Sequence, residues 1–151
     1  MNEIMKFIKL NSKIFRNTQM YLDKVLKKYG LSSGNFRYLF IIEVNEGISQ
    51  NRLSREIGND KAMSARTITK LVKAGFVKKV EDQNDARACN LYLTDKGWDV
   101  IPKLHNEIAA FEQVITGDLT EIEKVQVMHS LNRIYQNTQS VVEQGELKIE
   151  K

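Results

Sequence analysis

The 151-residue chain contains a single cysteine, Cys89, and two histidines, His105 and His129. One cysteine cannot form an internal disulfide or a cysteine-rich zinc site, and two histidines leave little for a metal centre or a catalytic triad. The sequence also has no glycine-rich phosphate loop and no arrangement of a nucleophile with a base. We therefore expect no cofactor, no bound metal and no enzymatic activity.

Long hydrophobic runs are also missing. The longest uninterrupted one is Tyr38–Ile42, far below the roughly 20 residues that a membrane-spanning helix needs. The N-terminus carries Lys6, Lys9 and Lys13 among its apolar residues, so it has no hydrophobic signal-peptide core. These features predict a cytoplasmic protein that has no membrane segment.

Proline occurs once and glycine 8 times, in a chain that is 42% hydrophobic and 28% charged. This composition is typical of a globular, helix-rich protein with one domain, or with one domain and additional oligomerisation helices. The charge is unevenly distributed: residues 1–48 hold 8 basic and 4 acidic side chains, residues 49–97 hold 10 and 6, and residues 98–151 hold 5 and 9. The positive two thirds could face a polyanion, although ordinary surface charge is the alternative.

Apolar residues with helical spacing predict long helices at both ends of the chain. The first covers residues 3–29 and stops at Gly30, and a second begins at a cap provided by Ser32 or Ser33 and reaches about residue 45. Thr94 can cap a later helix that ends at Gly117 and has Pro102 inside it, which should kink it or open its hydrogen bonds. Residues 120–123 form a capping box for a last helix.

The middle of the chain predicts a helix-turn-helix followed by a β-hairpin. Ser49 can cap a short helix, and Asp60 can cap a second one that runs from residue 61 to residue 74. Residues 76–81 and 89–93 then alternate in twos, as strands do. The polar segment 82–88 lies between them and forms the hairpin tip. This order is the plan of a winged helix-turn-helix protein.

A helix of this kind can enter the major groove of DNA and present its N-terminal half to the base edges. If Ile68 and Leu71 form its core face, the opposite face is cationic. A solvated helix face is the alternative. The residues predicted to contact DNA from this helix are Lys61, Ala62, Met63, Arg66, Lys70 and Lys73. The preceding helix offers Ser49, Gln50 and Asn51 at its N-terminus, where free backbone N–H groups favour a phosphate.

Three segments in succession resemble the MarR family of transcriptional regulators: Leu71–Val77, Asp82–Arg87 and Leu91–Gly97. The family's wing carries an Asp-x-Arg element, followed by a strand and a Leu-Thr-x-x-Gly start to the next helix. The resemblance implies that Asp85 braces the wing, by pairing with an arginine or with the loop backbone, and that Arg87 enters the minor groove. An arginine on a hairpin tip suits the negative potential of a narrow minor groove.

The resemblance also implies a fold that is mainly α with a small β-hairpin wing. Residues 31–97 would form the winged helix-turn-helix DNA-binding domain, and residues 1–30 and 98–151 the helical dimerisation region. We therefore expect a homodimeric repressor that binds a pseudo-palindromic operator in double-stranded DNA. The alternative is a winged-helix protein-interaction module without DNA binding.

Members of this family often bind a small phenolic or aromatic carboxylate effector where the winged domain joins the dimerisation helices. Aromatic residues near this junction could form its walls, and Arg16 or Arg37 could meet a carboxylate; the alternative is that the aromatics are core residues. The aromatic candidates are Tyr21, Tyr29, Phe36, Tyr38, Phe40 and Trp98.

Cys89 is in phase with Leu91 and Leu93 along the second hairpin strand. It is therefore predicted to be a small buried hydrophobic residue, and the family's usual redox sensing through a cysteine in the N-terminal helix is not expected. His105 and His129 lie on or near inward helix faces, where we expect packed or interface histidines rather than metal ligands.

Overall fold

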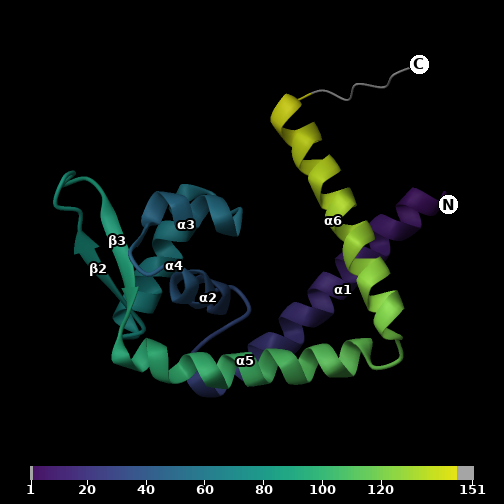
Figure 1. Ribbon diagram of the computed structural model, residues 1–151, viewed down its shortest axis with the longest axis horizontal. Helices are drawn as coiled ribbons and strands as arrows, with labels where there is room; N and C mark the ends of the chain where they lie inside the picture. The colour runs from purple at the N-terminus through teal and green to yellow at the C-terminus, as the bar shows by residue number, and fades with distance from the viewer. Residues whose placement is uncertain (1, 146–151) are drawn as a thin grey trace. The chain divides into compact units, whose positions relative to one another are not determined.

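The computed structural model describes residues 2–145, and the chain divides into two compact units, Met1–Glu107 and Ile108–Lys151. The prediction of a mainly helical protein with a hairpin wing is confirmed (Figure 1). Its elements, in chain order, are α1 (Glu3–Leu26), the 3-10 helix η1 (Lys27–Tyr29), α2 (Phe36–Val44), β1 (Ile48–Ser49), α3 (Gln50–Ile57), α4 (Lys61–Lys73), β2 (Val77–Glu81), β3 (Cys89–Leu93), α5 (Asp95–Thr116) and α6 (Glu121–Gln144).

The predicted helix caps of α3, α4 and α6 are present. The Ser49 hydroxyl accepts the backbone N–H of Arg52 at 3.2 Å, and Asp60 Oδ1 accepts that of Met63 at 2.7 Å. The capping box of α6 is formed in both directions between Thr120 and Glu123. Each cap satisfies backbone N–H groups that have no partner within the helix, so these helices begin where the sequence indicates.

The predicted start of α2 is wrong. Neither Ser32 nor Ser33 caps it: the backbone N–H of Ser32 donates to Asn35 Oδ1, and that of Ser33 donates to Asp23 Oδ1. Residues 33–35 form a turn, and the helix begins at Phe36. The two serines use their backbone N–H groups to anchor the turn, a role that their hydroxyl-bearing side chains do not reveal in the sequence.

The sheet has three antiparallel strands in the order β1-β3-β2. The predicted hairpin is β2 with β3, in a register that pairs Val77 with Leu93 and Glu81 with Cys89. The additional strand β1 pairs Ile48 with Leu91. It is too short to show alternation in the sequence. Through it the sheet holds the start of α3 beside the hairpin.

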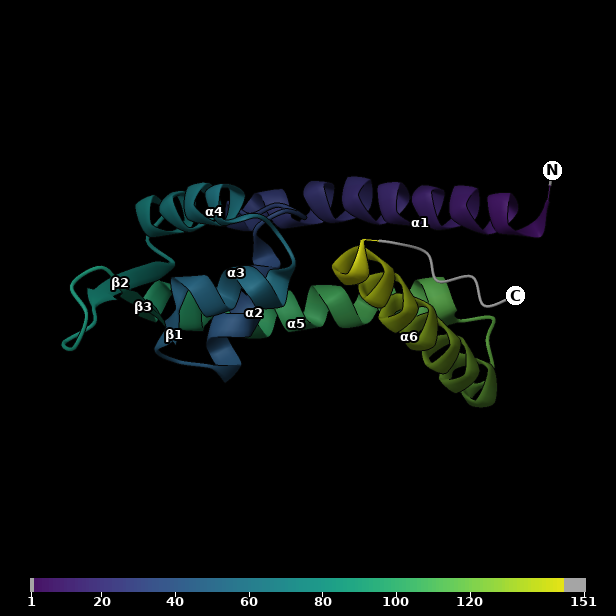
Figure 2. The same ribbon diagram turned by 90° about the horizontal axis from the view of Figure 1, so that it is seen from above.

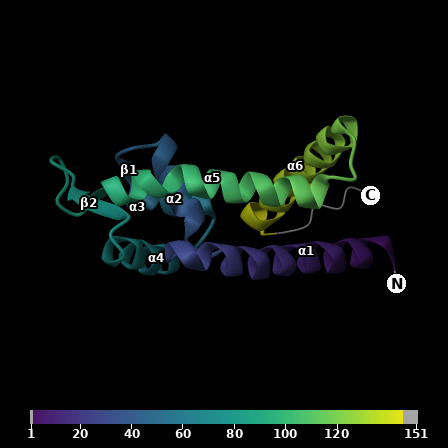
Figure 3. The same ribbon diagram turned by 90° about the horizontal axis from the view of Figure 1, so that it is seen from below.

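The core of the first unit lies where α2, α3 and α4 gather beside the C-terminal end of α1, as the views from above and below show (Figures 2 and 3). The N-terminal part of α1 extends beyond them. The core residues that are almost completely excluded from solvent are Leu26, Tyr38, Leu39, Ile42, Leu53, Ile68, Leu71, Leu91 and Leu104. Burial of side chains of this size supplies most of the favourable free energy of folding.

The hairpin is joined tightly to the start of α5. Thr94 caps this helix as predicted, because its Oγ1 accepts the backbone N–H of Gly97 at 3.1 Å. The same hydroxyl donates to the carbonyl of Gly75, and the Thr94 N–H donates to the carbonyl of Phe76. Helix α5 then continues through Pro102 without interruption. The end of α4, the hairpin and α5 therefore meet in one hydrogen-bonded joint.

The second unit contains the end of α5 and all of α6. No side chain of α6 is buried in the described part of the chain, although its apolar residues recur at helical spacing. The residues that this spacing places on one face are all exposed: Ile122, Val125, Met128, Leu131, Tyr135, Thr138 and Val142. None of the described helices is both long and apolar enough to span a membrane.

Candidate nucleic-acid interface

Helix α4 has one buried and one cationic face. Ile68 and Leu71 are 0% and 1% exposed, so the predicted core face is confirmed, and Ser64 on the same face is fully buried. The residues of this helix that were predicted to contact DNA are all exposed: Lys61, Ala62, Met63, Arg66, Lys70 and Lys73. Because the buried face fixes the rotation of the helix, a stripe of cations points away from the core.

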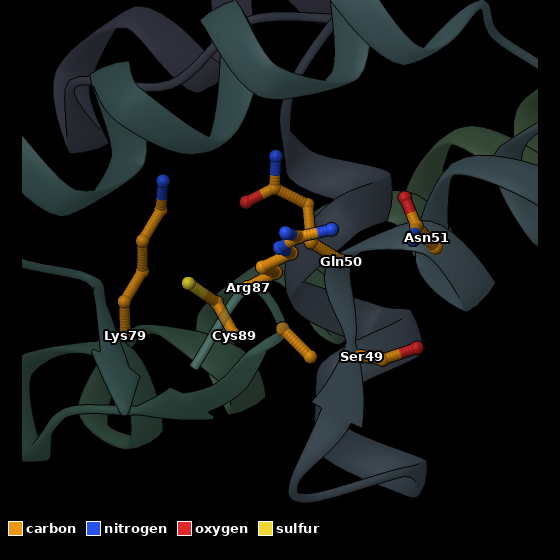
Figure 4. Close-up of a pocket in the computed structure, with 7 residues that line it drawn as sticks. Ser49, Gln50, Asn51, Lys79, Arg87 and Cys89 are labelled. Atoms are coloured by element: carbon orange, nitrogen blue, oxygen red, sulfur yellow. The ribbon is translucent and has the colours of Figure 1, made fainter. Parts of the chain in front are cut away.

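The start of α3 and the hairpin together border a pocket of about 240 Å³ (Figure 4). Ser49, Gln50 and Asn51 line it from α3, and Arg87 lines it from the wing. The structure thus brings Arg87 to the same pocket as three predicted DNA-contacting residues that lie more than thirty positions earlier in the sequence. Figure 4 shows the Arg87 side chain extending towards Gln50, with Lys79 on the opposite side of the pocket.

The wing tip is held by two aspartates that bond to their own loop. Asp85 Oδ1 accepts the backbone N–H of Arg87 at 2.9 Å, so of the two predicted pairings for Asp85 the structure has the one with the loop backbone. Asp82 Oδ1 accepts the N–H of Asn84 at 2.8 Å. This backbone hydrogen bond holds the pKa of Asp82 below its usual range. These short-range bonds shape the tip and leave the Arg87 side chain exposed.

The prediction that Cys89 is buried is wrong, because Cys89 is only half-buried and lines the same pocket. It shares a face of the hairpin with Leu91 and Leu93, which are buried, but the core ends at Leu91. The alternation of a strand indicates the side on which a residue lies and not how far the core extends along that side.

Lys79 also lies beyond the end of the core, and it was not identified from the sequence as a pocket residue. It is two residues from the buried Val77 and opposite Leu91 in the register, so alternation alone places it inside. Its side chain is exposed and lines the pocket together with Arg87. The adjacent Lys78–Lys79 pair was the only available signal, and it did not show which lysine faces α3.

A second cavity, of about 420 Å³, lies between α1, α2 and α4. Three of the predicted effector residues line it, namely Phe36, Arg37 and Tyr38. Met63 and Thr67 of α4 line it as well. Met63 is therefore part of both the exposed surface of α4 and the wall of this cavity, a position that its helical phase alone does not reveal.

The other five predicted effector residues do not line this cavity: Arg16, Tyr21, Tyr29, Phe40 and Trp98. Phe40 and Tyr29 contact residues elsewhere in the first unit. The Phe40 ring stacks on His105 with centroids 4.4 Å apart, and the Tyr29 hydroxyl donates to Glu107 Oε1 at 3.0 Å. Phe40 also contacts the Phe36 ring edge-to-face, with centroids 5.6 Å apart, but of these two rings only Phe36 lines the cavity.

His105 is exposed on α5 and not on an inward face as predicted, although its ring stacks on Phe40 and its Nε2 lies 2.9 Å from Glu43 Oε2. His129 is exposed on α6, so its predicted inward position is not found within a single chain. Among residues 2–145 no group of three or more histidine, cysteine or acidic side chains could hold a metal ion.

An ion pair joins α5 to η1, the 3-10 helix that follows α1. Lys28 pairs with Glu107, which also accepts from Tyr29. These two donors, the lysine above all, hold the pKa of Glu107 below its ordinary value, and the carboxylate in turn raises the pKa of Lys28. The pair therefore links η1 to α5.

Comparison with known proteins agrees with this architecture. The model of the MarR family matches residues 31–89. The HTH-type transcriptional regulator BilQ of Clostridioides difficile is 33% identical over 117 residues, which cover 78% of this chain and 79% of BilQ. The solved MarR protein from Peptoclostridium difficile is 28% identical with a TM-score of 0.87, and the match covers 93% of this chain and 92% of that one. The DNA complex of MepR from S. aureus shares the fold, with a TM-score of 0.83 at 17% identity over 87% of this chain and 97% of MepR.

Proposed function

The chain belongs to the MarR family of transcriptional regulators, which are not enzymes, and on this premise we propose that it binds operator DNA as a homodimer. The observation that carries the proposal is the orientation of α4. Its buried face is fixed by Ser64, Ile68 and Leu71, and this leaves its cations on the surface. MepR of S. aureus, which shares the fold, has been solved in complex with DNA, and this supports the same use of the fold here.

In the proposed complex α4 lies in the major groove. Its N-terminal half, with Lys61, Ala62, Met63 and Arg66, is the part that can approach base edges. Lys70 and Lys73 follow on the same exposed face, where they would bind backbone phosphates. An arginine can form a bidentate contact with guanine, whereas a lysine acts as a flexible point charge. We therefore assign base recognition to Arg66 and anchoring to the two lysines.

The pocket between α3 and the wing would lie against the backbone beside the major groove. Ser49, Gln50 and Asn51 present the N-terminus of α3, which favours a phosphate, and Arg87 projects from the wing that would reach the adjacent minor groove. Asp85 takes no part in binding itself in this arrangement. It shapes the loop from which Arg87 projects.

The homodimer is proposed from the apolar residues that a single chain leaves uncovered. Within the first unit most of them lie on α1, and within the second they lie on α5 and α6. Large exposed apolar patches mark interaction surfaces. The large exposed residues of these helices are Ile4, Met5, Ile8, Leu10, Ile14, Phe15, Met20 and Tyr21 of α1, and Val114, Ile115, Ile122, Val125, Val127, Met128, Leu131, Ile134, Tyr135, Val141 and Val142 of α5 and α6 in the second unit.

Two-fold symmetry of such a dimer would place two copies of α4 about one helical turn of DNA apart, which requires a pseudo-palindromic operator. Sedimentation at micromolar protein concentration tests the dimer, because a stable monomer would contradict it. Repression of transcription, in the cytoplasm, is the regulatory outcome that we propose for such binding.

The effector proposal now centres on the cavity between α1, α2 and α4. Phe36 supplies an apolar wall and Arg37 a cation, which suits a small aromatic carboxylate. Such a ligand changes DNA affinity only by binding the two conformations of the protein unequally, and a tenfold effect needs about 1.4 kcal/mol. Linkage makes the test two-sided: salicylate measured by calorimetry should bind the free protein more tightly than the protein–operator complex. Equal affinities would exclude this class of effector.

A protein-interaction module without DNA binding is the second candidate function. Such a module would not require exposed cations on both α4 and the wing, whereas DNA binding does. Titration of a fluorescent random duplex at several salt concentrations separates the two functions. The proposed regulator should lose affinity steeply as salt rises, because phosphate contacts release counterions. An absence of binding at low salt would favour the interaction module.

A further inference from the structure

A small hydrogen-bonded network is buried in the helix-turn-helix, on the side of α4 opposite its exposed cations. The Tyr38 hydroxyl, from α2, accepts a hydrogen bond from Asn59 Nδ2 at 3.0 Å and lies 3.3 Å from Ser64 Oγ in α4. Ser54 of α3 donates its hydroxyl to the backbone carbonyl of Asn59 at 3.1 Å. One interior point therefore connects α2, α3, the turn after α3 and α4.

The Tyr38 and Ser64 side chains of the network are buried in the core, and Asn59 is partly buried. Tyr38 is 1% exposed and Ser64 is 0% exposed, and Ile68 and Leu71 of the same α4 face are equally buried. In the described part of the chain every buried side-chain nitrogen and oxygen has a hydrogen-bond partner. Separating such partners would leave unpaired polar groups in the interior, which is unfavourable.

Hydrogen bonds are directional, whereas apolar packing tolerates small rotations and shifts. Ile68 and Leu71 alone would allow α4 to turn slightly about its axis while remaining buried. The contact between Ser64 and Tyr38 restricts that rotation, because Ser64 can meet the hydroxyl only over a narrow range of angles. A turn of roughly 20° displaces the outer surface of a helix 10–12 Å wide by about 2 Å, which is enough to break a base contact.

We propose that the Tyr38 hydroxyl is a positioning group for sequence recognition, which fixes the rotation of α4 and thereby the direction in which Arg66 projects. The inference rests on the proposed function of α4 as the DNA-reading helix. Tyr38 itself does not contact DNA in this proposal. It acts through Ser64 and Asn59, and its loss should reduce the discrimination between sequences more than the general affinity for DNA, because flexible lysines reach phosphates from a range of positions.

The experiment compares two affinities for each variant under identical salt conditions. An operator is first selected from a random pool of duplexes by repeated binding to the wild-type protein. The dissociation constants for this operator and for a random duplex are then measured by fluorescence anisotropy. In Tyr38→Phe, we expect the operator affinity to fall about tenfold, comparable with the loss of one base contact, and the random-duplex affinity to change less than about twofold.

Two further variants and one control make the result specific. Ser64→Ala should reproduce the effect, and the double variant should lose little more than either single one, because both residues belong to one network. Tyr29→Phe removes the same atom from a hydrogen bond to Glu107 that does not involve α4, so it should keep the wild-type ratio of the two affinities. Circular dichroism at the assay temperature verifies folding, and Ser64→Ala decides the question if Tyr38→Phe does not fold.

The inference is overturned if the ratio of operator to random-duplex affinity stays at its wild-type value in the folded variants. A proportional loss of both affinities, or an equal effect of Tyr29→Phe, would overturn it as well, because each indicates a general structural role. If the wild-type protein selects no sequence from the pool, the proposed function of α4 fails and the inference falls with it. If the wild type selects an operator and Tyr38→Phe discriminates equally well, only the inference fails.

Discussion

Gly97 lies directly against the backbone of Phe76: a Cβ atom at position 97 would overlap the Phe76 carbonyl oxygen and would crowd the side chain of Leu93. The approach is this close because Thr94 caps α5 and at the same time holds the Gly75 and Phe76 carbonyls. This contact explains why the Leu-Thr-x-x-Gly segment ends in a glycine. Glycine at its last position lets α5 pack onto the end of α4 and the first residues of the hairpin.

We expect Gly97→Ala to destabilise the protein by about 1–3 kcal/mol or more, because the overlap is with backbone that cannot move without breaking the joint. Thermal unfolding followed by circular dichroism measures the change. Gly34→Ala is the matched control, since a Cβ there would meet only Ser32 Oγ at 3.8 Å. Equal melting temperatures for Gly97→Ala and the wild type would show that the joint is not rigid.

Arg66→Ala should relax the base preference and cost about 1–3 kcal/mol on the operator, because it removes a bidentate base contact. Lys70→Ala should instead weaken binding to all sequences alike and lower the salt slope by about one. Titration of operator and random duplexes at several salt concentrations distinguishes the two effects. If Arg66→Ala weakened both duplexes equally, the proposed docking of α4 would be wrong.

Arg87→Ala should reduce affinity mainly for operators with A·T-rich flanks, where the minor groove is narrow and most negative. Duplexes that differ only in their flanking sequence provide the measurement. Lys79→Ala is a useful comparison, because Lys79 lines the same pocket but projects from a strand instead of the wing tip. We expect it to weaken binding to all flanks alike, and an identical dependence on the flanks would contradict a minor-groove role for Arg87.

Glu107→Gln should lower the melting temperature by about 2 °C at pH 7. Lys28 and Tyr29 depress the pKa of Glu107 below its ordinary value of 4.5, so the folded state favours the carboxylate and its stabilisation is lost as the pH falls through the lowered pKa. The difference from the wild type should therefore shrink below about pH 4.5. Glu112→Gln, an exposed position on the same helix, is the control, and a pH-independent difference would argue against the ion pair.

Much of the fold could be predicted from local signals. Ser49, Asp60 and Thr120 cap their helices as expected, because capping depends on residues only two or three positions apart. The hairpin and the cationic face of α4 also follow from periodicity. The start of α2 could not be predicted, since Ser32 and Ser33 use backbone groups to bond with Asn35 and Asp23, and the second of these partners lies ten positions away.

The sequence by itself therefore determined the order of the helices and the hairpin, the winged helix-turn-helix plan and the residues that α4 exposes. Only the tertiary structure decided that β1 joins the sheet, that Lys79 and Cys89 line the pocket beside Arg87, that Tyr38 bonds with Asn59 and Ser64, and that three of the eight predicted effector residues line one cavity. The physical reason is that periodicity reports the face on which a residue lies, whereas the end of the core and the meeting of distant side chains depend on how separate elements pack.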